Sequence, residues 1–95
     1  MQVNLTSQFQ RTRKKYFKND IALNEKIDST IELLKQDYLN HSLHYKKINC
    51  KKDKKRHSIR IPSTQYRILM TVHEDLTELI CICDHDEYNM FNKNC

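Results

Sequence analysis

The stretch that decides the fold is HSIRIPSTQYRILMTVHEDLTELICIC, residues 57–83. Within 57–61 and 66–72, apolar or aromatic side chains occupy every second position, which is the period of a half-buried β-strand. A third apolar run, Leu79 to Cys83, is short and rich in β-branched and thiol side chains, as in a buried strand. The segments PST (62–64) and EDL (74–76) between these runs favour turns. Strands joined by such short connections predict an antiparallel meander.

Two amphipathic helices are predicted before this meander. VNL (3–5) fits a short first strand, Thr6 or Ser7 fits the N-cap of one helix, and Asp20 fits the N-cap of the next. The apolar faces of these helices comprise Phe9, Tyr16 and Phe17 in the first, and Leu23, Ile27, Ile31 and Leu34 in the second. Spacings of three, four, seven and eight residues place such side chains on one helix face, so we assign them to the core.

The order strand, helix, helix, strand, strand, strand predicts an α+β fold in a single domain, residues 1–95. Two N-terminal helices should pack on one face of a small, mainly antiparallel four-stranded sheet, with residues 40–56 as an irregular basic connection. Arg60 and Arg67 are out of phase with the apolar residues of their strands and should therefore lie on the other face. There they either bind a phosphate through their planar guanidinium groups or pair with Glu78 or Glu87.

Positive charge is concentrated in the middle of the chain. Residues 41–67 carry nine Lys or Arg and one Asp or Glu, whereas residues 68–95 carry one and six. A segment with a net charge of +8 in a chain with a net charge of +5 indicates a polyanionic partner, although a solvated lysine loop has the same composition.

Several classes of protein are excluded by composition. The chain has no glycine, so neither a P-loop nor a dinucleotide-binding fingerprint is present, and we expect no cofactor. No run of about 20 apolar residues predicts a membrane span. The opening MQVNLTSQFQRTRKK lacks the apolar segment of a signal peptide. We therefore expect a cytoplasmic protein that does not bind membranes, with its four cysteines reduced.

Four motifs together resemble one family. LHYKKI, SIRI, QYRILMTV and ICICDHDEYNMF are similar to the C-terminal half of the RelE/ParE superfamily of type II toxins, and the Tyr66-Arg67 pair is the sharpest match. VNLTSQFQRTRKK and IDSTIELLKQD resemble the first strand and the two helices of that family. His85 in the terminal segment moves the comparison toward members that use a terminal histidine.

The resemblance implies a toxin that a cognate antitoxin protein holds inactive. RelE-like members cleave mRNA, usually on the ribosome, and need no metal for this endoribonuclease activity, so mRNA and the ribosome are the expected partners. ParE-like members instead inhibit DNA gyrase by binding it. A degenerate toxin that only binds its antitoxin is a third possibility. The lysine-rich segment and His85 favour the nuclease.

Metal-independent RNA cleavage requires proton transfer and stabilisation of negative charge on the phosphate. His85 is the candidate for proton transfer, with Asp84, Asp86 or Glu87 orienting its imidazole. Arg60 and Arg67 are the candidate phosphate ligands, and Tyr88 stacks on a base, binds the phosphate or packs the end of the chain. The residues expected to follow the RNA backbone are Lys46, Lys47, Lys51, Lys52, Lys54, Lys55 and Arg56.

The sequence CICDH also raises the possibility of a zinc site. Cys81 and Cys83 are two apart on a strand, so both thiols should point to one face. A structural zinc site normally shows a second pair of ligands, and only Cys50 and Cys95 remain. We therefore predict buried thiols and no metal.

Overall fold

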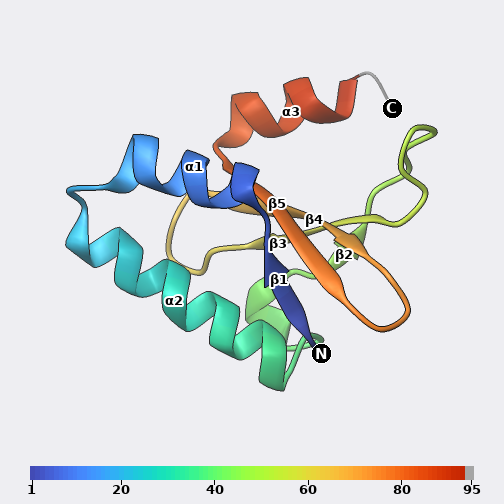
Figure 1. The fold of residues 1–95 in the computed structure, drawn as a ribbon, viewed down its shortest axis with the longest axis horizontal. Helices are drawn as coiled ribbons and strands as arrows, with labels where there is room; N and C mark the ends of the chain where they lie inside the picture. Colours follow the sequence, from blue (N-terminus) through green and yellow to red (C-terminus); the bar gives the residue numbers. More distant parts are fainter. Residues whose placement is uncertain (94–95) are drawn as a thin grey trace.

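The computed structural model describes residues 1–93, which form a five-stranded sheet and three α-helices (Figure 1). The elements in chain order are β1 (Val3–Leu5), α1 (Ser7–Phe17), α2 (Ile21–Gln36), a 3₁₀ turn (His41–Leu43), β2 (Lys46–Lys47), β3 (Arg56–Arg60), β4 (Arg67–Val72), β5 (Thr77–Cys83) and α3 (His85–Lys93). The strand order is β1-β5-β4-β3-β2. None of the helices in this part of the chain is long and apolar enough to cross a membrane.

The predicted meander is confirmed. β3, β4 and β5 pair antiparallel, whereas β1 lies parallel to β5 at one edge. The prediction of four strands is wrong, because the two-residue strand β2 pairs with β3 at the other edge. This strand lies within the segment that we expected to be irregular, and two residues are too few to produce a periodic pattern.

α1 and α2 cover one face of the sheet and enclose the main core, as predicted (Figure 1). Thr6 caps α1 by accepting the Phe9 N–H at 3.2 Å, and its hydroxyl also donates to the Leu79 carbonyl of β5 at 2.8 Å. Asp20 caps α2 in the same manner, through the Leu23 N–H at 3.0 Å. The predicted α2 stripe is buried along its whole length.

Tyr16 is an exception to the predicted core. Its side chain is 56% exposed, whereas Phe9 and Phe17 are buried. The half-buried Thr12 and Arg13 lie between those two phenylalanines, so the inward face of α1 follows a spacing of about four residues and leaves Tyr16 on the outside.

A β-bulge in β5 reverses the face of the sheet to which the following side chains point. Leu69 pairs with Cys81 but Met70 pairs with Leu79, so Ile80 is an extra residue on β5. Consequently Leu79 contributes to the core under α1 and α2, and Cys81 points to the opposite face.

The opposite face of the sheet, where we expected Arg60 and Arg67, is partly covered. The helix α3, which the sequence did not predict, covers part of it and encloses a second, smaller cluster (Figure 1). The members of this second cluster are Ile48, Cys50, Leu69, Cys81, Cys83 and Tyr88.

Candidate functional site

Two arginines face each other at one end of the sheet. Arg60 ends β3, Arg67 begins β4, and the two residues are direct cross-strand partners, so both side chains leave the face opposite α1 and α2. Neither forms an ion pair within the described residues, and Glu78 is hydrogen-bonded to His73 at 2.7 Å. The Arg60 Nε donates only to a backbone carbonyl, that of Thr64, at 3.3 Å. Like charges placed opposite each other are destabilising, and within residues 1–93 no acidic side chain offsets the charge of this arginine pair.

Tyr88 holds one of these arginines in place. The guanidinium carbon of Arg67 lies 4.8 Å from the centroid of the Tyr88 ring, which is a cation–π contact. The Tyr88 hydroxyl lies 3.3 Å from Ser58 Oγ on β3. The tyrosine is buried, with 8% of its surface exposed, so it packs the last helix against the sheet, which is one of the alternatives predicted for it. The half-buried Arg67 is thus fixed from α3, while Arg60 is exposed.

His85 is the first residue of α3 rather than the end of a strand. The helix begins with a reciprocal pair of hydrogen bonds: Asp84 Oδ1 accepts the Glu87 N–H at 2.8 Å, and Glu87 Oε1 accepts the Asp84 N–H at 3.2 Å. This capping box satisfies backbone donors that the helix leaves open. Asp84 and Glu87 therefore cap α3, and Glu87 forms no ion pair with Arg60 or Arg67 within residues 1–93. The role of Asp84 or Glu87 in orienting His85 stays a prediction.

The imidazole of His85 is exposed, and its Nε2 lies 3.2 Å from the side-chain nitrogen of Asn89, one helical turn later. When that amide nitrogen donates, Nε2 is the acceptor and the imidazole is neutral. Cys83 pairs with Arg67 across the sheet, and His85 follows two residues later, so the start of α3 lies at the same end of the sheet as the arginine pair. No hydrogen bond joins His85 to either arginine within the described residues.

Two thiols lie on the face of the sheet that α3 covers. Cys81 and Cys83 are free and buried, as predicted, and the Cys83 thiol donates to the Arg67 carbonyl at 3.7 Å. A hydrogen bond from Cys83 lowers the pKa of Cys81, and the same bond together with burial raises the pKa of Cys83. Cys50 is disulfide-bonded, so the prediction of a reduced thiol is wrong there, and Cys95 lies outside the described residues.

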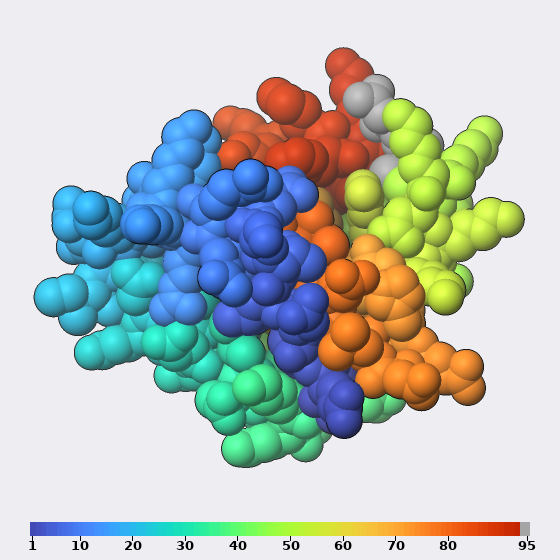
Figure 2. All heavy atoms as spheres, in the orientation of Figure 1, coloured from blue at the N-terminus to red at the C-terminus, as the bar shows by residue number. Residues whose placement is uncertain are grey.

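The six lysines predicted to bind RNA are all exposed (46, 47, 51, 52, 54 and 55), and we call them the lysine block. In Figure 2 this yellow-green segment projects from the right-hand edge of the molecule. The block adjoins the start of β3, whereas the arginine pair lies at the far end of that strand. The predicted site residues therefore fall into two groups at opposite ends of the sheet.

Arg56, the seventh predicted RNA-binding residue, is half-buried and fixes the loop that carries the lysines. Its Nε lies 3.8 Å from Asp53 Oδ2, and its Nη1 donates to the Phe91 carbonyl of α3 at 3.3 Å. Asp53 also accepts the Thr71 hydroxyl at 2.7 Å and the Lys55 N–H at 3.0 Å. These contacts anchor the loop to β4 and α3.

Sequence reasoning missed Ser58 and Asp53. Asp53 is the only acidic residue in the basic segment 41–67, and this was a usable signal. Nothing in the sequence indicated Ser58, because its hydrogen bond to Tyr88 depends on the position of α3. No group of three or more His, Cys, Asp or Glu side chains within residues 1–93 could hold a metal ion.

Comparison with known proteins places this geometry in a recognised fold. No family model matches the sequence, and no curated protein sequence matches it. The Escherichia coli YafQ structure in the DinJ-YafQ complex has a TM-score of 0.72 at 14% identity, over 90% of this chain and 93% of that one. A YoeB/ParE toxin from Agrobacterium tumefaciens has a TM-score of 0.69 at 18% identity, over 90% and 99%.

A copper-bound mutant toxin from Helicobacter pylori has a TM-score of 0.64 at 24% identity, over 92% of this chain and 97% of that chain. At these identities the likeness concerns the arrangement of helices and strands. All three likenesses cover 90% or more of this chain, so they concern the fold as a whole. The chain therefore has the fold of the RelE/ParE toxins, which confirms the resemblance drawn from its sequence.

Proposed function

We propose that this chain is the toxin of a type II toxin–antitoxin pair and that it cleaves mRNA without a metal. The observation that carries the proposal is the uncompensated Arg60–Arg67 pair, with Arg67 held against the ring of Tyr88 at 4.8 Å. A phosphate in a cleavage reaction gains negative charge in the transition state, and preorganised cations stabilise that charge. The two guanidinium groups supply such cations at the end of a rigid sheet.

Arg60 and Arg67 are the proposed phosphate ligands. Tyr88 is a positioning residue, because its ring and its hydrogen bond to Ser58 determine where the Arg67 guanidinium lies. Removal of the ring would leave the charge of Arg67 intact but no longer fix its position, and electrostatic stabilisation depends on position.

His85 is the proposed proton-transfer residue. It is exposed at the same end of the sheet as the arginines, and a neutral imidazole that accepts from Asn89 can take a proton from a ribose 2′-hydroxyl. To do so, Nε2 must exchange the Asn89 amide for the substrate hydroxyl, because Nδ1 carries the hydrogen in this tautomer. Asn89 then takes the orienting role that we had assigned to the acidic residues.

The lysine block is proposed to bind the RNA backbone away from the cleavage site. The solved relatives DinJ-YafQ and YoeB-YefM are complexes of a toxin with an antitoxin. A cognate antitoxin is accordingly the proposed protein partner of this chain, with the ribosome-bound message as the substrate and the cytoplasm as the location.

The test is primer extension on a translated message before and after induction of the protein. Discrete cuts within codons support the nuclease, whereas intact RNA with damaged DNA supports inhibition of gyrase. Arg67→Ala and His85→Ala should abolish cleavage and growth arrest, while His41→Ala, which alters another exposed histidine, should leave both unchanged. If His85→Ala remained fully toxic, its catalytic assignment would be wrong.

A further inference from the structure

A second positively charged surface runs along the outside of α1. Four exposed cations on α1 and directly after it, Arg11, Lys14, Lys15 and Lys18, are spaced three, one and three residues apart. Residues three and four apart lie on one side of a helix, so these side chains form a single stripe. We call these four residues the α1 stripe. No acidic residue occurs in this part of the chain before Asp20.

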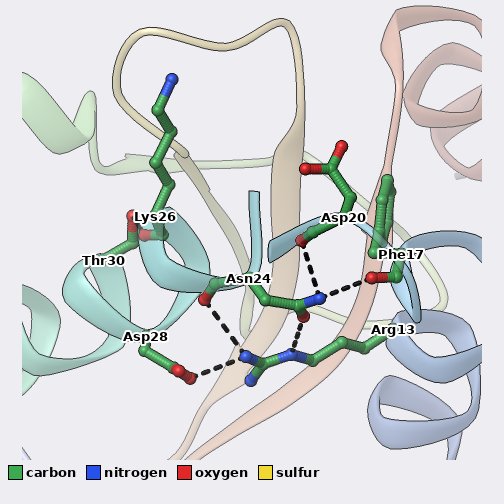
Figure 3. Close-up of polar contacts among 7 residues, drawn as sticks. All are labelled: Arg13, Phe17, Asp20, Asn24, Lys26, Asp28 and Thr30. Carbon is green, nitrogen blue, oxygen red and sulfur yellow. Dashed lines mark hydrogen bonds and ion pairs between the residues drawn. The ribbon is translucent and has the colours of Figure 1, made fainter. Parts of the chain in front are cut away.

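Arg13, the remaining cation of α1, shows by contrast what a structural arginine does here (Figure 3). Its Nε donates to Asn24 Oδ1 at 2.8 Å and its Nη2 to Asp28 Oδ1 at 2.8 Å, which fastens α1 to α2. No member of the α1 stripe forms an ion pair with any described residue, and Lys15 contacts only the ring of Tyr16, at 5.1 Å. The stripe therefore carries four charges that the fold does not neutralise.

An exposed aromatic ring lies among these charges. Tyr16 is 56% exposed and lines a surface hollow of about 470 Å³ together with Lys15, Lys18 and Asp20, whose carboxylate caps α2. A second hollow, of about 440 Å³, is lined by Arg13, Lys14 and Lys18, so Lys18 borders both. A cationic groove with an aromatic ring on which a base can stack is the arrangement that binds single-stranded nucleic acid.

One aromatic contact brings the end of α1 close to the strand that begins with Arg67. Phe17 at the end of α1 packs against Tyr66, with ring centroids 4.9 Å apart, and Tyr66 directly precedes Arg67. The end of the stripe thus lies beside the turn that joins the two arginine-bearing strands. In Figure 1, α3 lies between α1 on one side and the loop of the lysine block on the other.

We propose that Tyr16 and the α1 stripe form a second subsite for single-stranded RNA. The inference rests on the proposed function: RNA held at the arginine pair continues round the end of the sheet onto α1, while the lysine block binds the strand on the other side. Four unneutralised cations in a row favour an extended polyanion as the ligand, and the exposed ring adds a stacking surface that favours RNA over an acidic protein.

The experiment measures binding of 2′-O-methyl RNA, which resists cleavage at the 2′-hydroxyl, with oligomers of about 6 and about 20 nucleotides chosen to span one or several subsites. The variants are Lys14→Ala/Lys18→Ala and Tyr16→Leu. Their matched controls are Lys26→Ala/Lys35→Ala, which removes two exposed lysines from α2, and Tyr38→Leu, which removes another exposed ring.

The double stripe variant should bind the long oligomer about tenfold more weakly and lower the slope of log K against log salt by about 1.4, since each lost phosphate contact on a single strand contributes about 0.7. Tyr16→Leu should also weaken binding about tenfold, through loss of one stacked base. The short oligomer should be unaffected by either change, and both controls should bind as the unmodified protein does.

Equal weakening by the stripe and control doubles would overturn the subsite, because net charge alone would then explain the effect. The subsite would also be overturned if the stripe variants bound RNA as the unmodified protein does but no longer formed a complex with an acidic protein. The α1 stripe would then bind that protein instead. In both cases Arg67→Ala would still weaken binding of the short oligomer. Failure of the proposed function is distinct: there Arg67→Ala has no effect, or the unmodified protein binds neither oligomer.

Discussion

The two faces of the sheet differ in size and in content. Thirteen buried apolar residues form the cluster under α1 and α2, whereas six buried residues form the cluster under α3, and three of those six are cysteines. The large face holds aliphatic and aromatic side chains that do no chemistry. The small face adjoins the arginine pair, Tyr88 and His85. Most of the stability should therefore come from one face, and the candidate chemistry from the other.

The helices that cover the two faces are also attached to the sheet in different ways. α1 and α2 are capped and then fastened to β5 and to each other. α3 has nine residues, and among them Tyr88 packs against the sheet and the Phe91 carbonyl accepts from Arg56. A short helix with few buried contacts opens at low free energy, so α3 should unfold locally before the rest of the chain.

The largest effect is expected for a change in the large face. Phe9→Ala removes a fully buried ring between α1 and the sheet. It should lower the free energy of unfolding by about 3–5 kcal/mol, from lost transfer energy and the remaining cavity. Urea unfolding followed by circular dichroism measures this change. A loss below about 1 kcal/mol would show that the two faces contribute more equally than their composition indicates.

Tyr88→Ala is the equivalent change on the small face. It should lower the free energy of unfolding by about 2 kcal/mol, less than Phe9→Ala, because its cluster is smaller and α3 can detach while the sheet stays folded. Amide hydrogen exchange should accelerate throughout α3 and remain slow in α2. Tyr88→Phe, the matched control, keeps the ring against Arg67 and loses only the Ser58 contact, so exchange in α3 should change little. Fast exchange in α2 as well would contradict local opening.

The faces also differ in how far they were predictable. The strands β3 and β4 and the helix α2 carry periodic apolar patterns, because one side of each faces the main core. That same phase placed Arg60 and Arg67 on the opposite face, so the part of the site formed by the strands could be predicted. β2 could not be, since two residues show no period.

α3 was missed for a different physical reason. Asp84 and Glu87, three residues apart before an apolar position, are a capping signature, but the adjacent His85 made an electrostatic role for them equally consistent with the sequence. Local sequence does not decide whether a carboxylate binds a backbone amide or an imidazole. The contact between Ser58 and Tyr88 depends on that helix, so it was also out of reach.

The thiols of the small face should make stability depend on pH. The pKa of Cys83 is raised above its ordinary value of 9.0, so above that pH the unfolded chain releases a proton that the folded chain keeps. Stability then falls by about 1.4 kcal/mol per pH unit for this one group. The pKa of Cys81 is lowered, so the stability it adds is present above 9.0 and is lost as the pH falls through its folded-state pKa.

Cys83→Ser removes the titrating thiol and keeps a donor for Cys81. Above about pH 9, where free thiols ionise, its free energy of unfolding should fall less steeply than that of the unmodified protein, by a difference that approaches about 1.4 kcal/mol per pH unit. Urea unfolding at a series of pH values measures both slopes. Parallel slopes would show that Cys83 ionises as readily in the folded state as in the unfolded one.

The smallest effect concerns the cap of α3. Asp84→Ala should lower the free energy of unfolding by about 1 kcal/mol, the usual cost of removing an N-cap, and should speed amide exchange in the first turn of α3. Asp86→Ala is the matched control, because it removes the same charge two residues later at an exposed position with no hydrogen bond to the described residues.

If capping is the role of Asp84, Asp84→Asn should retain most of the stability, since asparagine is an equally good N-cap, and should leave the pH dependence of any RNA cleavage unchanged. If Asp84 instead holds the charge of His85, Asp84→Asn should shift that pH dependence toward lower pH while the helix stays intact, because a cation loses its stabilising partner. The comparison between Asp84→Ala, Asp84→Asn and Asp86→Ala separates a carboxylate that begins a helix from one that controls an imidazole.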